Sequence, residues 1–142
     1  MLIGQLALVT AAAFTGAAIY VTVAEQPARL ALDDAALLTQ WQSSYPRASV
    51  MQAGLALGSA LLGLAAYWSS GDWRWLAGAV LIFGNLPFTI LVILPTNKAL
   101  QAVAPAAADG STRRAIETWA RLHLVRDALG LLATAAYLWA GH

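Results

Sequence analysis

One stretch near the C-terminal end combines residue types that suit acid–base chemistry. Trp119, His123 and Arg126 are four and three residues apart, so a helix would place them within about 60° of one another. Histidine takes up a proton readily near neutral pH, and a guanidinium group stabilises a developing oxyanion. We therefore interpret His123 as a candidate base and Arg126 as a candidate oxyanion partner. Asp127, four residues after His123, is expected to pair with His123, with Arg126 or with another helix.

Further polar side chains are expected at the same level of a helical bundle. Glu25 and Asn97 close the first and third apolar segments, so they are candidate catalytic residues that orient His123 or the substrate. Glu25 is also an alternative base if it is partly desolvated. A purely structural alternative is an ion-pair cluster in which Glu25 joins Arg126 or Arg47 and only locks the helices. The candidate substrate-binding residues are aromatic side chains and one amide: Trp41, Tyr45, Gln52 and Trp119.

The residue types that are missing exclude several cofactors. There is no cysteine, which rules out disulfides, thiolate chemistry, Fe–S clusters and cysteinyl zinc sites. The histidines, His123 and His142, are too far apart for a bis-histidine haem in one bundle, and no Glu-x-x-His pair is present for a di-iron site. Two alternatives remain for a cofactor. One is a single-histidine metal site or a haem at His123, with Glu25 as a further ligand, and the other is that the protein has no cofactor.

The composition is typical of a membrane protein. The chain has 142 residues, of which 60% are hydrophobic and 11% charged, with a net charge of +1, and this excludes an ordinary cytosolic domain and a nucleic-acid-binding protein. Long uncharged runs predict spanning helices. We expect an all-α, four-helix transmembrane bundle that forms a single integral membrane domain over residues 1–142. The predicted helices are approximately 2–24, 48–70, 74–96 and 118–140.

Two irregularities are expected in this bundle. The connection over residues 25–46 is long enough to hold a short interfacial helix between the first two spans. Pro87 should kink the third span near Asn85, because proline lacks the amide hydrogen that a helix needs.

Charged and aromatic residues predict the orientation. Arg74 lies on the short hairpin, whereas the other basic residues lie on or near the two longer connections: Arg29, Arg47, Lys98, Arg113, Arg114, Arg121 and Arg126. The positive-inside rule places the longer connections in the cytoplasm and both termini outside. Aromatic residues near the outer ends predict an interfacial belt: Trp68, Trp73, Trp75, Tyr137 and Trp139.

The sequence resembles the DUF1772 family of four-helix membrane proteins, which is grouped with anthrone oxygenases. The resemblance covers nearly the whole chain and is carried, in order, by AAIYVTVAEQPARL, WQSSYPRASVMQA, LPFTILVILPTNKAL and WARLHLVR. Its most specific elements are P-T-N-K and W-x-x-x-H-x-x-R. The resemblance implies that Asn97, His123 and Arg126 occupy the positions that the family pattern marks.

The resemblance implies an oxygenase that uses O2 as co-substrate, and we expect its substrate to be a flat lipophilic ketone, phenol or quinol. The chemistry of such a reaction fits the residues without needing a cofactor. A base would remove a proton from an acidic C–H, and an oxyanion partner would stabilise the resulting anion in a dry pocket. One alternative is a non-enzymatic carrier or binding protein for a quinone or another small lipophile, and a further one is a structural accessory subunit. The expected partners are the bilayer and a small lipophilic substrate. Stripes of small residues also permit a homo-oligomer.

Overall fold

The computed structural model describes all 142 residues, and nearly all of them are helical. Four helical rods lie side by side, and we number them in chain order. The first rod comprises α1 (Leu2–Tyr20), the π-helical segment η1 (Val21–Glu25) and α2 (Gln26–Leu30), and the second rod is α3 (Asp34–Ser70). The third rod comprises α4 (Trp73–Phe83), α5 (Asn85–Phe88), the π-helical segment η2 (Thr89–Ile93) and α6 (Leu94–Gln101). The fourth rod is α7 (Gly110–Ala140). The expected all-α four-helix bundle is confirmed.

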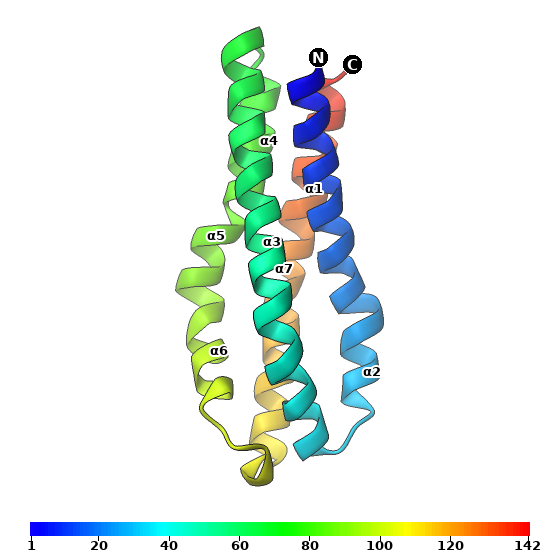
Figure 1. Cartoon of the computed structure of the whole chain (residues 1–142), viewed down its shortest axis with the longest axis vertical. Helices are drawn as coiled ribbons and strands as arrows, with labels where there is room; N and C mark the ends of the chain where they lie inside the picture. The colour runs from blue at the N-terminus through cyan, green and yellow to red at the C-terminus, as the bar shows by residue number, and fades with distance from the viewer.

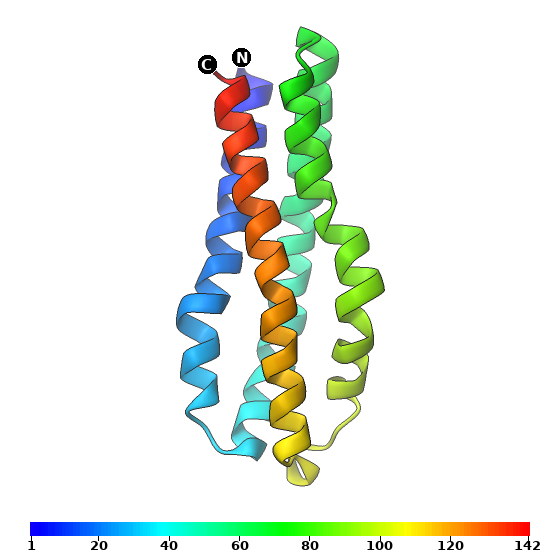
Figure 2. The same cartoon turned by 180° about the vertical axis from the view of Figure 1, so that it is seen from behind.

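The rods alternate in direction, so both termini lie at one end of the bundle (Figures 1 and 2). The connections over residues 31–33 and 102–109, the latter containing the short helix η3 (Pro105–Ala107), lie at the opposite end. Helices α1 and α4 each pack against both α3 and α7. We call the half with the termini the terminal half (residues 1–16, 54–84 and 128–142) and the rest the polar half.

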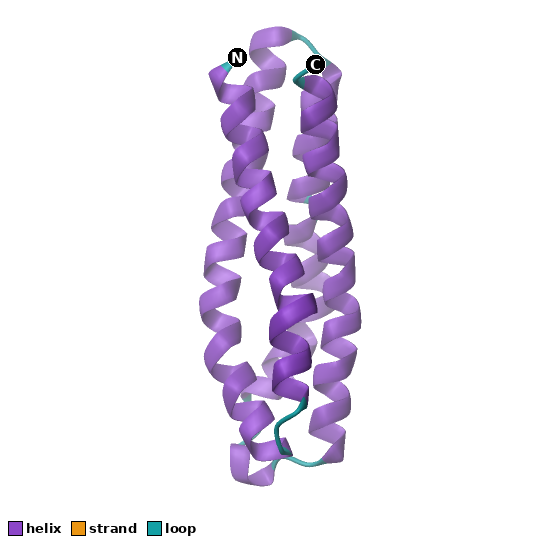
Figure 3. Ribbon diagram, turned by 90° about the vertical axis from the view of Figure 1, so that its right-hand side faces the viewer, coloured by secondary structure: helices purple, strands orange, loops and turns teal.

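Three of the four rods are long and apolar enough to cross a membrane: Leu2–Leu30, Asp34–Ser70 and Trp73–Gln101. This fits an integral membrane protein. The fourth, α7, is less apolar but runs along the whole length of the bundle (Figure 2), and the helical rods lie side by side (Figure 3). Its charged and polar side chains at His123, Arg126 and Asp127 are buried against the neighbouring rods.

The helices are longer than expected, and a separate interfacial helix is not confirmed. Residues 34–47 are instead the first turns of α3, which continues through Pro46 without interruption. A proline inside a helix costs about 3 kcal/mol or more. Burial of Leu37, Leu38 and Trp41 against the facing rods offsets this cost.

The first and third rods bow away from α3 and α7 in the polar half (Figure 2). In both rods a five-residue π-helical segment is followed by a short helix with proline in its first turn, Pro27 in α2 and Pro95 in α6. Proline has no amide hydrogen to donate to the carbonyl four residues earlier, and a π-helical shift accommodates this loss. The kink expected near Asn85 is also present, because the third rod changes direction where α4 gives way to α5 (Figure 1).

The terminal half is closely packed around aromatic rings. Tyr137 is fully buried against Gly63 and Gly78, where a Cβ on either glycine would overlap its ring. Trp75 is buried beside Tyr137, with ring centroids 5.7 Å apart. The prediction of an interfacial belt is therefore wrong for Trp75 and Tyr137. The other three predicted belt residues are exposed: Trp68, Trp73 and Trp139.

Candidate functional site

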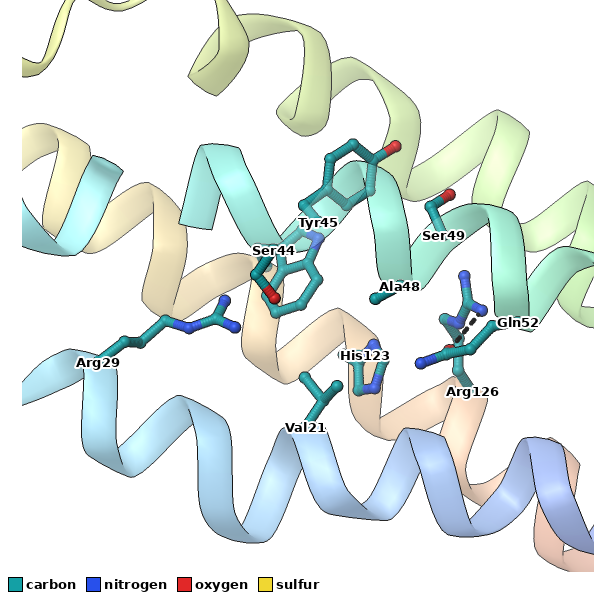
Figure 4. Close-up of a pocket in the computed structure, with 10 residues that line it drawn as sticks. Val21, Arg29, Ser44, Tyr45, Ala48, Ser49, Gln52, His123 and Arg126 are labelled. Carbon is teal, nitrogen blue, oxygen red and sulfur yellow. Dashed lines mark hydrogen bonds between the residues drawn. The ribbon is translucent and has the colours of Figure 1, made fainter. Parts of the chain in front are cut away.

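A small cavity, which we call the central chamber, lies between the first rod, α3 and α7 in the polar half. It offers about 20 Å³ to the centre of a water-sized molecule. Figure 4 shows the guanidinium groups of Arg29 and Arg126 on opposite sides of His123, with Ala48 on the α3 side of the imidazole. Ten residues line the chamber: Val21, Arg29, Ser44, Tyr45, Ala48, Ser49, Gln52, Trp119, His123 and Arg126.

His123 is held through one ring nitrogen and is free at the other. Nε2 lies 3.1 Å from the carbonyl oxygen of Ala18 and 3.5 Å from Oδ1 of Asp127. A carbonyl oxygen only accepts, so we assign the proton of the neutral ring to Nε2. Nδ1 makes no hydrogen bond and is not fully enclosed, which leaves its lone pair available to take a proton. Thr22 donates to the other carboxylate oxygen of Asp127 at 2.6 Å and so fixes that side chain.

Arg126 is a buried cation without a carboxylate partner. Its guanidinium donates to Oγ1 of Thr89 at 2.8 Å and to Oε1 of Gln52 at 2.9 Å, and both acceptors are neutral. Nε has no partner, and no ion pair includes Arg126. A buried charge that lacks a counter-ion is costly, and such groups usually face a cavity or a ligand. Arg126 is therefore positioned to receive an anionic oxygen.

Glu25 belongs to a second charged group on the far side of His123. Its carboxylate pairs with Arg29 one helical turn later, at 2.8 Å, and accepts hydrogen bonds from Gln40 and Ser44. Arg29 is buried with Nε and one terminal nitrogen unpaired, and its guanidinium lies 5.7 Å from the centroid of the Trp119 ring. Arg29 therefore lines the chamber with a guanidinium that is paired with Glu25 but still has two nitrogens without a hydrogen-bond partner.

Aromatic rings form the remaining walls. Trp41 stacks on Tyr45 with a centroid distance of 4.9 Å and meets Trp119 edge to face at 5.9 Å, while Trp119 stacks on His123 at 5.2 Å. The Tyr45 hydroxyl accepts a hydrogen bond from Nδ2 of Asn97 at 2.8 Å. The hydroxyl proton of Tyr45 is therefore free to be donated to another oxygen.

Two larger cavities adjoin the chamber. One, which we call the lateral cavity, offers about 240 Å³ between α3, the α5–η2 segment and α7, and it shares Tyr45, Ser49 and Arg126 with the chamber. The second offers about 150 Å³ between the first rod and α7, and it shares Val21, Trp119 and His123 with the chamber. A small molecule in the lateral cavity would lie against Arg126 and against Thr89, one of the two acceptors of its guanidinium.

The geometry connects all eight predicted site residues in one region. His123, Arg126, Tyr45, Gln52 and Trp119 line the chamber itself, while Asn97 and Trp41 reach it through Tyr45. Glu25 approaches only through Arg29 and Ser44. The partners differ from those expected, since neither Glu25 nor Asn97 hydrogen-bonds to His123 and Glu25 pairs with neither Arg126 nor Arg47.

The residues named as metal ligands do not come together. His123 faces Ala18 and Asp127, and Glu25 faces Arg29, so the two do not form a common ligand set. No group of three histidine, cysteine, aspartate or glutamate side chains converges anywhere in the structure.

Similarity to known proteins identifies the family of this chain. A family model described as "Anthrone oxygenase" matches residues 41–136, more than half of the chain. The chain belongs to the anthrone oxygenase family. It is 44% identical over 59 residues to anthrone oxygenase tpcL of Aspergillus fumigatus, covering 39% of this chain and 37% of the relative. It is 32% identical over 111 residues to an anthrone oxygenase of Claviceps purpurea, covering 70% of this chain and 64% of the relative. The chain thus spans less than two thirds of either curated relative. No solved structure matches it significantly.

This member of the anthrone oxygenase family uses polar residues that sequence reasoning did not select for the site. Arg29 contacts Glu25, Thr89 contacts Arg126, and Thr22 contacts Asp127 beside the site. Arg29 is buried as deeply as His123. The spacing of four residues between Glu25 and Arg29 was a usable signal, because side chains at this spacing are neighbours on a helix. The contacts of Thr22 with Asp127 and of Thr89 with Arg126 join different rods. They cannot be predicted from a local sequence pattern. Of the partners considered for Asp127, the structure gives His123 at 3.5 Å and a residue of another rod, Thr22, but not Arg126.

Proposed function

We propose that this protein is a membrane oxygenase that oxidises a flat, lipophilic ketone, phenol or quinol with O2. Membership of the anthrone oxygenase family suggests an oxygenase-like function. One observation carries the assignment to this site: a buried guanidinium without a counter-ion, Arg126, lies next to a histidine whose Nδ1 is free. This combination suits the removal of a proton from a neutral substrate and the stabilisation of the anion that forms.

His123 acts as the base through Nδ1. The carbonyl oxygen of Ala18 holds Nε2 and thereby fixes the tautomer, while the Asp127 carboxylate stabilises the imidazolium that forms when Nδ1 takes the proton. Thr22 keeps the carboxylate in place. Asp127 is therefore a positioning residue, because it acts through His123.

Arg126 and Tyr45 stabilise negative charge on oxygen. Both line the lateral cavity as well as the central chamber, and each has a donor that no protein group uses. The substrate's rings occupy the lateral cavity, and its acidic C–H lies at the boundary that Tyr45, Ser49 and Arg126 share with the chamber, which His123 lines. Trp41 supports Tyr45 by stacking. Asn97 orients the Tyr45 hydroxyl, and Gln52 orients Arg126. Preorganised donors of this kind are each worth about 10²–10³ in rate.

The reaction balances without a further oxidant. Loss of one proton from the methylene of an anthrone gives a delocalised anion, which passes one electron to O2. The carbon radical and superoxide combine to form a C–O bond, and the peroxide takes up a proton. Loss of the second methylene proton with cleavage of the O–O bond leaves a quinone carbonyl and one molecule of water. Four electrons thus pass from the methylene carbon to O2.

The first experiment measures O2 uptake by the purified protein with anthrone as the probe. We expect uptake above the spontaneous rate, with one quinone formed per O2. His123→Gln should lower kcat by about 10²–10⁴-fold, whereas His142→Gln, at the exposed C-terminus, serves as the matched control and should leave the rate unchanged. Full activity of His123→Gln would contradict the assignment of the base.

Metal content and visible absorption are measured on the same preparation. A stoichiometric metal or haem that is lost in His123→Gln would make His123 a ligand and would overturn its role as the base. Tight binding of anthrone without O2 uptake would favour the alternative of a non-enzymatic carrier for a small lipophile.

We further propose that the polar half faces the cytoplasm. Seven basic residues lie in or near this half or its connections, whereas Arg74 alone lies at the terminal end, which supports this orientation. Because the chain has no cysteine, single cysteines report the topology directly. A membrane-impermeant thiol reagent should label Ser70→Cys in intact cells and Ala106→Cys only after lysis. The reverse pattern would contradict the proposed orientation.

A further inference from the structure

The two cavities that share Arg126 differ greatly in size. The central chamber offers about 20 Å³, and the lateral cavity about 240 Å³, by the same measure. A space of about 10–15 Å³ by this measure holds one water molecule. The central chamber therefore suits a molecule of one or two heavy atoms and excludes a ring system, whereas the lateral cavity has the volume to hold one.

The central chamber is also unusually rich in unused donors. Arg29 contributes Nε and one terminal nitrogen without partners, and Arg126 contributes Nε. The two guanidinium groups flank the chamber from opposite sides (Figure 4). Arg29 pairs with Glu25 and Asp127 contacts His123, whereas no carboxylate contacts the guanidinium of Arg126. Such a site gains little by holding a neutral molecule and much by holding a small anion.

Together, size and charge distinguish a site for O2 from a site for the organic substrate. We propose that the central chamber receives O2 and stabilises the superoxide formed from it, while the lateral cavity holds the organic substrate; this rests on the proposed oxygenase function. One electron passes from the substrate anion to O2, which leaves a carbon radical in the lateral cavity and superoxide between Arg29 and Arg126. Combination of the two forms the C–O bond at the boundary that Arg126, Tyr45 and Ser49 share.

Two alanines on α3 test the division of the site. Ala48 lines only the central chamber, and Ala53 lines only the lateral cavity. Both are half-buried, so they form a matched pair. Ala48→Val should raise KM for O2 by about tenfold or more and leave KM for anthrone within about twofold. Ala53→Val should do the reverse. An increase in the anthrone KM alone in both variants would overturn the proposal.

A measurement on the unmodified protein does not depend on whether the variants fold. Chloride is a small anion that fits the chamber, and sulfate is a larger one. At constant ionic strength, replacing sulfate by chloride should inhibit competitively with O2 and not with anthrone. Competition of chloride with anthrone, or no inhibition up to about 0.5 M chloride, a concentration at which a weak site for a small anion is expected to fill, would overturn the proposal.

The outcomes separate this inference from the proposed function. If the unmodified protein consumes no O2 with any flat ketone, phenol or quinol, the oxygenase function fails and the O2 site fails with it. If O2 uptake depends on His123 but Ala48→Val and chloride leave KM for O2 unchanged, the oxygenase function stands and only the O2 site is wrong.

Discussion

The two halves of the bundle differ in how their buried polar side chains are hydrogen-bonded. In the terminal half, Ser59 donates to the carbonyl of Ala7 at 2.9 Å, and the Tyr137 hydroxyl donates to the carbonyl of Ser59 at 3.0 Å. No buried side-chain nitrogen or oxygen of that half lacks a partner. All such atoms belong to the polar half and are carried by Gln26, Arg29, Gln40, Trp41, Asn85, Asn97, Trp119, Arg126 and Asp127.

This difference separates stability from function along the length of the molecule. Close contacts between glycines and aromatic rings hold the rods together at one end. The other end has the bowed rods, the unpaired donors and the cavities that Arg126 and His123 line. Unpaired buried polar groups each cost about 1–3 kcal/mol, so the polar half carries a cost that packing in the terminal half must offset. Changes in the two halves should therefore have different consequences.

Among these variants, we expect Arg126→Met to show the largest difference between its effect on activity and its effect on stability. Loss of the guanidinium should lower kcat/KM with anthrone by about 10²–10³-fold, because the developing anion loses its charged partner. Thermal stability in detergent should stay the same or rise, since an apolar side chain replaces a buried charge that has no counter-ion. Arg114→Gln, on the exposed face of α7, is the control for the loss of a positive charge. A large loss of stability in Arg126→Met would instead make Arg126 a structural residue.

The variant Asp127→Asn tests whether the contact between Asp127 and His123 supports catalysis. The amide keeps the size of the side chain and a hydrogen bond with Thr22 but no longer stabilises an imidazolium. We expect kcat to fall by about 10–100-fold, less than in a serine-protease triad, because the contact here is 3.5 Å long. The expected reduction is in kcat, with KM for anthrone unchanged. An increase in KM alone would show that Asp127 acts in binding and not on the base.

Gly63→Ala tests the terminal half. A Cβ at this position overlaps the Tyr137 ring, so we expect the variant to lose about 1–3 kcal/mol of stability. Gly58→Ala on the same helix has no atom within contact of the added Cβ and serves as the control. The measurement is thermal unfolding in detergent, together with kcat per folded molecule. A selective loss of kcat in folded Gly63→Ala would contradict the separation of stability from function.

Asp109→Ala should have the smallest effect. Hydrogen bonds from the Ser111 hydroxyl and from the backbone amides of Thr112 and Ser111 lower the pKa of the Asp109 carboxyl. A lowered pKa in the folded state means that the cap stabilises α7 above the unfolded value of about 3.9 and is lost as the pH falls through the folded value. Hydrogen exchange at Ser111 and Thr112 should speed up near pH 7 in the variant and differ little from the unmodified protein at strongly acidic pH. Equal exchange at pH 7 would contradict a stabilising cap.

Much of the architecture could be predicted because it depends on local properties. The uncharged runs give the lengths of the first three rods, and proline chemistry gives the irregularity near Asn85. Boundaries were less predictable: the first turns of α3 contain polar residues and Pro46, and only the burial of Trp41 and its neighbours shows that they belong to a long helix. The belt prediction failed at Tyr137 for a similar reason, since the small residues that receive its ring lie on other rods.

The sequence by itself determined which chemical groups meet at one level of the bundle. Helical spacing aligns Trp119, His123 and Arg126, and it also pairs His123 with Asp127, because residues four apart are neighbours on any helix. Only the tertiary structure decided their partners across rods. The contact of Ala18 with His123, the contact of Thr89 with Arg126 and the volumes of the two cavities all depend on how far the rods bow. That distance is set by packing between segments far apart in the chain, which no local pattern records.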